Sequence, residues 1–521
     1  MYLIVVHYHL RPGGVRRVIE LATPHLVRRA PEPVSAVVLG TGEAPDADWL
    51  RGFRRRLGRT PVKVFVEPAF GYVSESNRNR RAIDRAILDG MKRLLAETSE
   101  NNCLVWAHNL GLGRNLRLAR RLVFACHNLG IPLIAHHHDW WFDNRWHHFR
   151  AKSESGLSRL DLLANTVLAA SPSVCHVAIN QADAAVLGKH FPGSSGWLPN
   201  PVEPETPPTA ARARAAETWL IEQIGGKAPV WLLPCRLLRR KNIAEALLLT
   251  RWLRPEAWLA TTGGVSSAEE ESYASTLNAA ARRHGWRLRL GLLQGNETLK
   301  PSVPELLAAS EAVLLTSLQE GFGLPYLEAA AAGRPLIARQ LSNIAPDLET
   351  FGFTFPQSYR EVQVGPDLFD WRSERQRQAG LFAEWKHLMP RAARRLAGKP
   401  TLLAAGSRRC PVPFSRLTLT AQIEVLARPI DESWARCAPL NPFLETWRTR
   451  AAAAQLQISP WPQSAARWLG GDIYAARFWS LVPTGLAARP APGASAAAQG
   501  QFLLQKLKAE NLYPLLWNSR T

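Results

Sequence analysis

Cysteine, methionine and long apolar runs are scarce in this sequence. Its 521 residues include 6 cysteines and 3 methionines. The cysteines lie far apart without metal-type spacing, so we expect buried free thiols in a reducing cytosol. No stretch approaches the ~20 uninterrupted apolar residues that a membrane span needs. The N-terminal run MYLIVVHYHL lacks a basic leader and a cleavage site, which favours a first buried strand over a signal peptide.

Acidic residues are also few relative to basic ones. The chain has 64 Lys and Arg against 43 Asp and Glu, a formal net charge of +21. Such a surface attracts anions such as nucleotide-sugars, phosphorylated acceptors or acidic lipid headgroups. The basic residues are spread along the chain and no nucleic-acid module is present, so we expect no nucleic-acid partner. Hydrophobic content of 46% and charged content of 21% indicate a soluble globular protein, and the length suggests two to four domains.

The most informative segment is 314–337, LLTSLQEGFGLPYLEAAAAGRPLI, which reads as strand, glycine loop, helix and strand. Gly321 and Gly323 interrupt the first apolar run, and their missing Cβ atoms allow a ligand to approach the backbone. Pro325 suits the first turn of a helix because its missing N–H would be unpaired there. The loop therefore directs backbone N–H groups and the positive end of a helix dipole toward an anion such as a diphosphate.

Two carboxylates bracket this predicted anion site. Glu320 precedes the glycines, and we expect Glu328 in the first turn of the helix, facing back toward the loop. Carboxylates do not bind phosphate, so their expected partners are hydroxyl groups, and the combination fits a nucleotide-sugar. The alternative is a structural helix N-terminus that carries a favourable acidic residue. The local sequence leaves both interpretations open.

The segment from Glu320 to Glu328, followed by AAAAGRPLIA, resembles the Glu-x7-Glu signature of the retaining GT-B glycosyltransferases of family 4. The resemblance implies an α/β fold with two Rossmann-like, doubly wound parallel-sheet domains that face a cleft. It further implies that Glu320 contacts sugar hydroxyls and Glu328 the ribose. Backbone amides of the loop would bind the phosphate or the sugar, at Gly321, Phe322, Gly323 and Leu324.

The first part of the chain alternates short apolar strands with helices, which favours a doubly wound parallel sheet. We predict strands at 34–40, 62–67, 103–109, 132–138 and 175–180, and helices at 80–97 and 115–129. Gly13 and Gly14 stand between the first strand and the first helix. They resemble the Gly-Gly loop that family 4 enzymes direct at donor phosphate or acceptor, although a simple turn is the alternative.

Polar residues gather after two of these strands, and the second cluster, from His136 to Trp141, has three interpretations. His136 and His138 point the same way along a strand and could bind a metal with Asp139, His147 or His148. The cluster could instead be a polar strand end capped by a tryptophan-rich loop. We favour the third interpretation, in which His138 matches the family histidine that reaches the donor sugar and the aromatic loop 140–146 helps form an acceptor pocket. No metal site is therefore predicted, and the acceptor-side candidates are His108, Asn109, His137, Asp139, Trp141 and Arg145.

The second part of the chain begins after the Pro-rich segment 204–209. Arg236 and Lys241 resemble the Arg-x4-Lys element with which family 4 enzymes neutralise the donor diphosphate. Fixed cations there would stabilise the charge of a departing nucleoside diphosphate. The alternative is that they are solvated surface cations, which is the interpretation given to the neighbouring Arg239 and Arg240. Strands are predicted at 257–264, ending in Gly263 and Gly264 beside the nucleotide, and at 288–294, where the family binds the base.

These features predict four segments. They are an acceptor-side domain at 1–203, a linker at 204–218, a nucleotide-sugar-binding domain at 219–430 and an extension at 431–521. A closing helix is expected at 414–426. Within the extension, 489–498 reads as a flexible linker, and 501–517 as a helix that packs on the body or, alternatively, lies on an anionic membrane surface.

The expected activity is transfer of a hexose from a nucleotide-sugar to an acceptor hydroxyl, with the retention of configuration that the family implies. The leaving phosphate oxygen would take the acceptor proton while cations hold the charge, with no cofactor beyond the donor. The expected catalytic residues are Arg236, Lys241, Glu320 and His138. The alternatives are a GT-B epimerase, a phosphorylase or a non-catalytic nucleotide-sugar-binding protein. Net charge and Arg145 hint at an anionic acceptor, and we expect a cytoplasmic protein, with peripheral membrane association as a variant.

Overall fold

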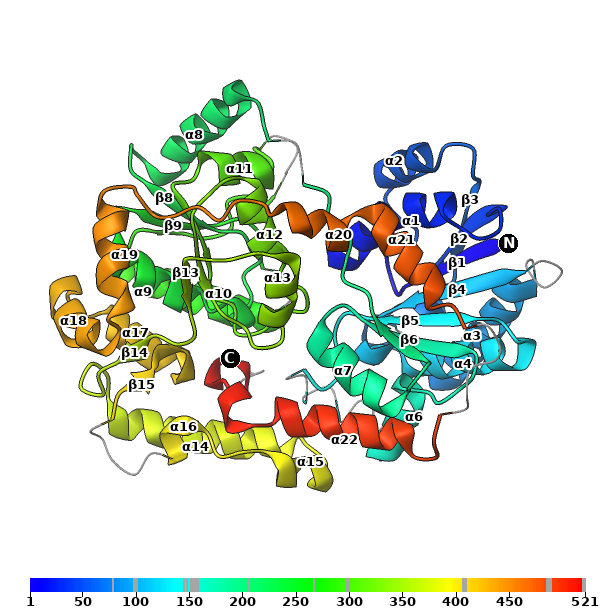
Figure 1. Ribbon diagram of the computed structural model, residues 1–521. Helices are drawn as coiled ribbons and strands as arrows, with labels where there is room; N and C mark the ends of the chain where they lie inside the picture. Colours follow the sequence, from blue (N-terminus) through cyan, green and yellow to red (C-terminus); the bar gives the residue numbers. More distant parts are fainter. Residues whose placement is uncertain are drawn as a thin grey trace. The chain divides into compact units, whose positions relative to one another are not determined.

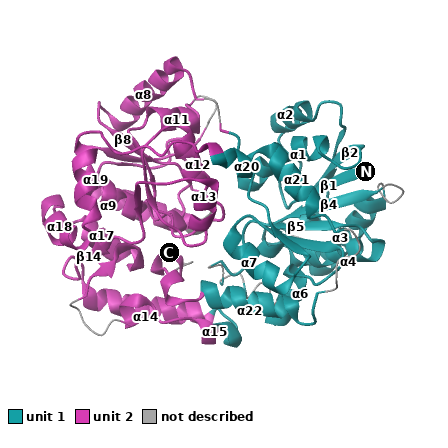
Figure 2. Cartoon of the chain, viewed as in Figure 1, with its two compact units in different colours: residues 1–203, 388–393, 464–506 teal, residues 204–387, 394–463, 507–521 magenta. Residues whose placement is uncertain are grey.

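The computed structural model describes residues 1–76, 79–96, 102–143, 146, 149, 159–204, 207–265, 268–295, 300–404, 410–483 and 490–517. The chain divides into two compact units (Figures 1 and 2). Unit 1 comprises residues 1–203, 388–393 and 464–506, and unit 2 comprises 204–387, 394–463 and 507–521. Both units are α/β, and the C-terminal region contributes to each of them.

Unit 1 is built on a seven-stranded parallel sheet of order β3-β2-β1-β4-β5-β6-β7. Its strands are β1 (Tyr2–Val6), β2 (Ala36–Thr41), β3 (Val62–Val66), β4 (Cys103–His108), β5 (Leu133–His137), β6 (Val174–Ala178) and β7 (Ser195–Trp197). Its helices are α1 (Gly14–Arg28), α2 (Ala47–Leu57), α3 (Arg80–Ala96), α4 (Leu116–Leu129), α6 (Leu160–Val167), α7 (Gln181–His190), α20 (Ala466–Leu469), α21 (Gly471–Ser480) and α22 (Ala494–Lys506).

Alternation along β1 supplies the two cores of unit 1. Leu3 and Val5 face a cluster that includes residues of α1 and α21, whereas Ile4 and Val6 face a cluster that includes residues of α3 and α4. Both faces of the sheet are thus covered, as expected for parallel strands. Tyr474 of α21 lies in the first of these cores, so the C-terminal region completes the unit.

Unit 2 contains a six-stranded parallel sheet of order β10-β9-β8-β11-β12-β13. Its strands are β8 (Val230–Leu233), β9 (Trp258–Thr261), β10 (Leu288–Arg289), β11 (Ala312–Leu315), β12 (Leu336–Arg339) and β13 (Gln357–Tyr359), with a separate antiparallel pair, β14 (Gln363–Val364) and β15 (Val412–Pro413). Its helices are α8 (Ala210–Ile224), α9 (Ile243–Leu253), α10 (Ala268–His284), α11 (Val303–Ala309), α12 (Leu324–Ala331), α13 (Ala345–Phe351), α14 (Trp371–His387), α16 (Thr401–Ala404), α17 (Leu419–Leu426), α18 (Ile430–Cys437) and α19 (Phe443–Ala452); α15 (Arg391–Leu396) has residues in both units.

Helix α9 forms the centre of the core of unit 2. Its sequence IAEALLLTRWL is apolar almost all round, and every residue except Arg251 is buried. A helix with this pattern needs partners on all sides, and it packs in one large cluster with residues of β8, β9, α17 and α19. The C-terminal residues Tyr513 and Leu515 belong to the same cluster.

The predicted pair of doubly wound parallel sheets is confirmed, but several local predictions were wrong. Helix α8 begins at Ala210, inside the expected linker, because Thr209 caps a run of strong helix formers. Helix α22 likewise begins at Ala494, inside the stretch expected to be flexible. The 501–517 helix ends at Lys506, and 3₁₀ turns follow at Ala509–Asn511 and Pro514–Leu516.

Two further elements are shorter than predicted. The strand expected at 288–294 ends at Arg289, and Gly291, at a φ of 67°, belongs to the turn that follows. The helix expected at 414–426 starts as a 3₁₀ turn at Phe414–Arg416, and α17 begins only at Leu419.

Cys410 is exposed, against the prediction that the cysteines are buried. No helix in the described ranges combines the length and the apolar character required to cross a bilayer.

Candidate functional site

The candidate site of unit 2 lies where the strand order of its sheet reverses. Strands β8 and β11 are neighbours, and the chain leaves them for opposite edges of the sheet. Doubly wound sheets bind ligands at such a switch point, beyond the carboxyl ends of the strands. The 3₁₀ turn Arg239–Lys241 follows β8, and Glu320 follows β11, so the topology brings these side chains together.

Glu320 binds two cations at this point. One carboxylate oxygen accepts a hydrogen bond from Lys241 Nζ, and the other lies 3.2 Å from Nη1 of Arg240. Burial would raise the pKa of Glu320, but the charges of Lys241 and Arg240 outweigh it and lower that pKa to about 2. Lys241 is also buried, at 7% exposure. The three residues therefore form a preorganised cluster with a net charge of +1.

The backbone around Lys241 is fixed from β11. The hydroxyl of Thr316 donates to the carbonyl oxygens of Lys241 (2.9 Å) and Asn242 (3.1 Å). Asn242 itself has a positive φ of 48°, and its amide donates to Glu245 at 2.9 Å. The backbone of Lys241 is thus held tightly by Thr316 and by the turn at Asn242. This restricts where the ammonium group of Lys241 can lie.

The glycine loop is held in place after β11. Gly323 has a φ of 83°, and a Cβ there would lie 2.9 Å from the Tyr326 ring, so both conformation and packing require glycine. Asn343 donates to the carbonyl oxygen of Glu320 at 2.8 Å. Helix α12 then begins at Leu324 without a side-chain cap, as the predicted anion site requires. Phe322 is buried, at 5% exposure.

Glu328 differs from its predicted position. It is exposed and is the fifth residue of α12, so the prediction that it lies in the first turn was wrong, because the helix begins one residue before Pro325. Arg236 is exposed as well. Arg239 and Arg240 were predicted to be solvated, but Arg239 is 7% exposed and Arg240 contacts Glu320.

Gly263 and Gly264 close the end of β9 against its neighbours. A Cβ on Gly263 would lie 2.9 Å from Cγ of Arg236, and a Cβ on Gly264 would lie 2.9 Å from Cγ of Gln294. Side chains that follow β8 and β10 thus pack over the end of β9. This close packing alone accounts for both glycines, and their predicted contact with the donor remains a prediction.

Sequence reasoning missed a buried ionic network beside this cluster. Arg339, at the end of β12, forms salt bridges with Glu245 and with Glu361, the latter at 2.6 Å. The hydroxyl of Tyr359 donates to Glu245 at 2.6 Å. A glutamate in the apolar helix α9 was the available signal, since a buried carboxylate requires partners.

In unit 1, Gly13 is the N-cap of α1 and Gly14 is its first residue, and both are exposed. Gly13 has an extended φ of 163°, and a Cβ on either residue would meet nothing closer than 3.9 Å. Neither the backbone conformation nor the packing therefore requires glycine at these two positions. That a ligand approaches the backbone here stays a prediction. Arg11 beside them pairs with Glu43 at 2.7 Å and Glu75 at 2.9 Å.

The polar ends of β4 and β5 are clamped together by Asn109. Its side-chain oxygen accepts from the backbone N–H groups of His138 (2.9 Å) and Asp139 (3.0 Å), and its own φ is 60°. The imidazoles of His108 and His138 are joined at 3.0 Å. The structure brings these four predicted residues together, and Asn109 has a clear positioning role.

The aromatic loop is packed more tightly than an open acceptor pocket would be. Trp141 is fully buried, with ring centroids 5.4 Å from Trp146 and 5.9 Å from Phe149. Trp140 packs against Phe502 of α22, at 4.7 Å between centroids. The rings thus serve as core beneath a C-terminal helix. Arg145, Asn144, His147 and His148 lie outside the described residues.

His137 is joined to another strand rather than to an open surface. Its Nε2 lies 3.0 Å from Nδ1 of His176 on β6, whose own Nε2 lies 3.1 Å from the carbonyl oxygen of Ala169.

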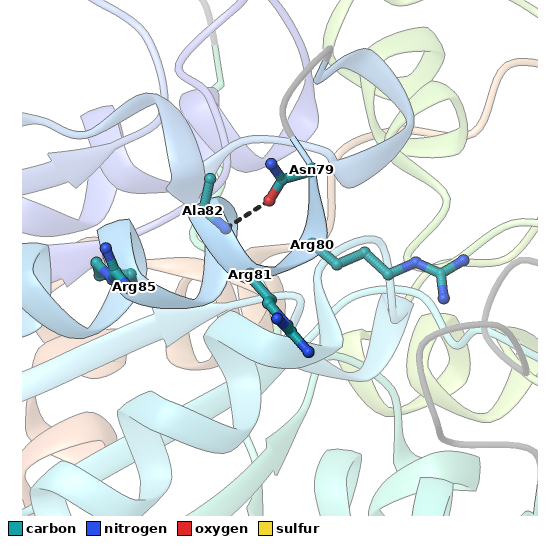
Figure 3. Close-up of a pocket in the computed structure, with 5 residues that line it drawn as sticks. All are labelled: Asn79, Arg80, Arg81, Ala82 and Arg85. Carbon is teal, nitrogen blue, oxygen red and sulfur yellow. Dashed lines mark hydrogen bonds between the residues drawn. The ribbon is translucent and has the colours of Figure 1, made fainter.

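A separate cavity of about 750 Å³ lies at the start of α3 (Figure 3). It contains none of the predicted site residues and is lined by Asn79, Arg80, Arg81, Ala82 and Arg85.

Comparisons with known proteins agree with this geometry. Residues 221–354 match the family model for glycosyl transferases group 1. A mannosylglucosyl-3-phosphoglycerate synthase from Petrotoga mobilis is 22% identical over 354 residues, which is 66% of this chain. The chain spans 65% of the length of this curated relative.

Solved structures show the same architecture. The N-terminal domain of Candida albicans trehalose-6-phosphate phosphatase has a TM-score of 0.50 at 11% identity, covering 92% of this chain and 96% of that one. Anabaena HepE in complex with UDP-glucose has a TM-score of 0.47 at 15% identity, covering 87% of this chain and 98% of that one. The likeness to the Candida domain agrees with the fold of two doubly wound parallel sheets, and a segment of unit 2 matches the group 1 glycosyl transferase model.

Proposed function

We propose that this chain is a retaining glycosyltransferase of family 4 that transfers a hexose from a nucleotide-sugar to an acceptor hydroxyl. The observation that carries the proposal is the convergence of Lys241, Arg240 and Glu320 at the switch point of the unit 2 sheet. This cluster lies within the segment that matches the group 1 model. A cationic cluster at this place suits a diphosphate, whose charge increases as the sugar departs.

Lys241 and Arg236 would have different roles in binding the diphosphate. Lys241 is held by Glu320 and cannot leave its place, so its charge is preorganised. Arg236 is exposed and has no ion-pair partner in the described part of the chain, so its planar guanidinium is available for bidentate binding of phosphate oxygens. The leaving phosphate oxygen would then take the proton of the acceptor hydroxyl on the same face of the sugar.

The remaining groups would orient the donor. Backbone N–H groups of 321–324 would bind phosphate or sugar oxygens at the uncapped start of α12. Each carboxylate oxygen of Glu320 keeps a second lone pair beside its cation, so contact with a sugar hydroxyl stays possible. Exposed Glu328 would accept from the ribose. Transfer would use no cofactor beyond the donor.

The proposed acceptor is an anionic hydroxy compound. The Petrotoga relative is named for a glycoside of a phosphorylated acid, and the present chain carries a net charge of +21. A phosphate or carboxylate on the acceptor would be attracted by such a surface. The proposal places the enzyme in the cytoplasm, where nucleotide-sugars and phosphorylated acids occur together.

Two assays test this proposal in sequence. Thermal shift against a panel of nucleotides and nucleotide-sugars should identify a stabilising base. With that donor, release of nucleoside diphosphate should depend on an acceptor, and NMR should show that the new glycosidic bond keeps the donor's anomeric configuration. Stabilisation by no nucleotide would overturn the proposal. An altered sugar without acceptor indicates an epimerase, and sugar phosphate released without nucleotide indicates a phosphorylase.

Two variants separate binding from transfer. Lys241→Ala should lower kcat by about 10²–10³-fold, since it removes charge stabilisation from the leaving group. Glu328→Ala should raise the donor Kd by about 10-fold, the loss of a charge-assisted hydrogen bond, with a smaller effect on kcat. Exposed Lys227→Ala is the control and should resemble wild type. Wild-type turnover in either test variant removes that residue from the site.

A further inference from the structure

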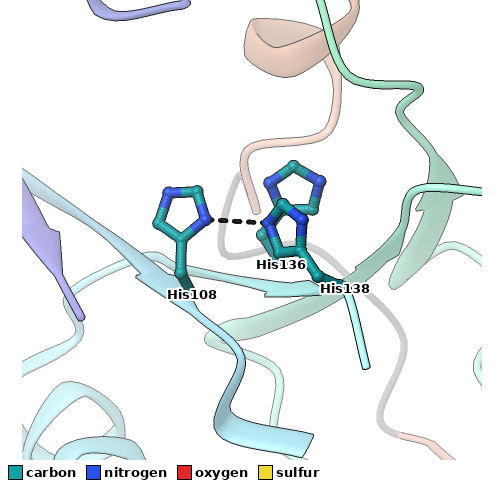
Figure 4. A group of neighbouring side chains, drawn as sticks. All are labelled: His108, His136 and His138. Carbon is teal, nitrogen blue, oxygen red and sulfur yellow. Dashed lines mark hydrogen bonds between the residues drawn. The ribbon is translucent and has the colours of Figure 1, made fainter. Parts of the chain in front are cut away.

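Three histidines of unit 1 converge at the carboxyl ends of β4 and β5 (Figure 4). His108 and His136 are direct neighbours in the register of these parallel strands. His138 follows two residues after His136, and alternate residues along a strand point to the same side. Two neighbouring strand ends therefore present three imidazoles at the sheet edge where doubly wound folds bind ligands.

The spacing of the rings is close to that of a metal site. One nitrogen from each ring lies within 4.8 Å of the corresponding nitrogens of the other two. Nδ1 of His108 and Nε2 of His138 are 3.0 Å apart. Two nitrogens bound to one tetrahedral zinc ion are about 3.3 Å apart, given Zn–N bonds of about 2.0–2.1 Å. Small side-chain movements would thus bring all three nitrogens to one ion.

Burial leaves part of this cluster without polar partners, although Nδ1 of His136 accepts a hydrogen bond from Nε1 of Trp106 at 3.3 Å. His108 is 1% exposed and His136 is fully buried. Nε2 of His136 and Nε2 of His108 each have no hydrogen-bond partner among the residues that the structure describes. A buried polar atom without a partner calls for an explanation such as a bound water or ion. Burial also keeps the pKa of each ring well below neutrality, so the rings carry the free lone pairs that a metal needs.

A second histidine pair in the same sheet shows the contrast. His137 and His176 form a hydrogen bond at 3.0 Å, and the carbonyl oxygen of Ala169 takes the other nitrogen of His176. That pair is a connection between β5 and β6 with one imidazole from each strand. The cluster of His108, His136 and His138 has three imidazoles, and its backbone is held in place by the Asn109 clamp.

We propose that His108, His136 and His138 bind one divalent transition-metal ion such as Zn²⁺, through one nitrogen each. Imidazole is a preferred ligand of Zn²⁺, Ni²⁺ and Cu²⁺, whereas Mg²⁺ and Ca²⁺ prefer oxygen. For both His108 and His138 to bind the ion, the ring that carries the hydrogen between them changes tautomer, so that this hydrogen lies on its other nitrogen and each imidazole stays neutral. Three protein ligands leave a fourth position for water or for an oxygen atom of a ligand.

Metal titration of the full chain tests this site. The protein is treated with EDTA, dialysed, and titrated with Zn²⁺ by calorimetry and with Co²⁺ by visible absorption. We expect one equivalent of Zn²⁺ to bind, Co²⁺ to give the strong visible bands of a tetrahedral site, and Mg²⁺ not to displace either ion. Wild-type protein that binds no Zn²⁺, or gives only the weak bands of octahedral Co²⁺, overturns the proposal.

Matched histidine variants locate the ion. His108→Gln and His138→Gln should each weaken Zn²⁺ binding by at least about 10-fold and remove the tetrahedral Co²⁺ bands. His176→Gln, in the neighbouring buried pair, and His284→Gln, on an exposed surface, should keep both. Circular dichroism checks that each variant is folded. Loss of binding in His284→Gln, or unchanged binding in both test variants, would show that surface histidines hold the ion and would overturn the site.

Discussion

The two sheets of this protein end in chemically opposite sites. At the switch point of unit 2, a buried carboxylate holds two cations. At the ends of β4 and β5 in unit 1, three imidazoles gather. Both sites lie at the carboxyl ends of parallel strands. The unit 2 site is at the strand-order reversal between β8 and β11, whereas the unit 1 site is at β4 and β5, and only β4 borders the reversal, which it forms with β1. The same backbone geometry thus supports two kinds of recognition.

The difference teaches how each site controls charge. In unit 2, the low pKa of Glu320 keeps the carboxylate ionised, and this carboxylate holds Lys241 at the site proposed for an anionic ligand. In unit 1, burial lowers the pKa of the histidines and keeps the site uncharged. A cluster of neutral nitrogens accepts metal ions or hydroxyl protons but attracts phosphate weakly.

The largest effect is expected from breaking the charged site. Glu320→Ala leaves Lys241 buried without its carboxylate, and loss of one partner of a buried pair costs about 3–5 kcal/mol. Urea unfolding followed by tryptophan fluorescence measures this change. Lys227→Ala, at an exposed position of unit 2, is the control and should stay within about 0.5 kcal/mol of wild type.

A double variant checks the cause of that loss. Lys241→Met combined with Glu320→Leu removes the two buried charges and should recover much of the stability that Glu320→Ala loses, because the remaining cation, Arg240, is partly exposed to water. If the double variant is as unstable as the sum of its single changes, the loss reflects packing. Charge would then not explain why the unit 2 site is more sensitive to substitution than the uncharged site of unit 1.

Acidification should separate the two sites. Burial lowers the pKa of His138 from 6.5 to about 4, so the unfolded chain takes up a proton before the folded one, and stability falls as pH drops through this range. Glu320 has a pKa lowered from 4.5 to about 2, and its contribution is lost only as pH falls from about 4.5 to about 2. Each site therefore has its own pH window.

The measurement compares metal-free variants between pH 7.0 and 5.0. His138→Gln should reduce the slope of unfolding free energy against pH by up to about 1.4 kcal/mol per unit, the value for one proton. Glu320→Gln should lower stability with an unchanged slope in this window. Equal slopes in wild type and His138→Gln would contradict the assigned pKa of His138.

The sequence predicted the sheets well and the side-chain partners poorly, for physical reasons. Alternating apolar strands and helices dictate a doubly wound sheet, and the glycine loop before Pro325 dictates a helix start after β11. The partnership of Lys241 with Glu320 depends instead on which strands become neighbours, which local spacing does not encode. Arg240 was misjudged for the same reason, since its partner lies 80 positions away in sequence.

The aromatic loop shows the same limitation over a longer range. Its composition suits a sugar-binding surface, yet Trp140 is covered by Phe502, which lies far along the chain in a segment predicted to pack only generally on the body. The histidine cluster was predicted in part, because the alternation of side chains along a strand placed His136 and His138 on the same side. His108 joined them only through the register of β4 and β5.

The smallest effect is expected at the exposed ion pairs beside Gly13 and Gly14. Arg11 binds Glu43 and Glu75, but all three side chains are 38–48% exposed, so water screens their attraction. Exposed pairs contribute about 0–1 kcal/mol, and Glu43→Ala leaves Glu75 in place. Urea unfolding should therefore show a loss below about 1 kcal/mol that shrinks further in 0.5 M salt. If Glu43→Ala lost about as much stability as Glu320→Ala, burial would not explain why the ion pairs of the two units differ in their contribution to stability.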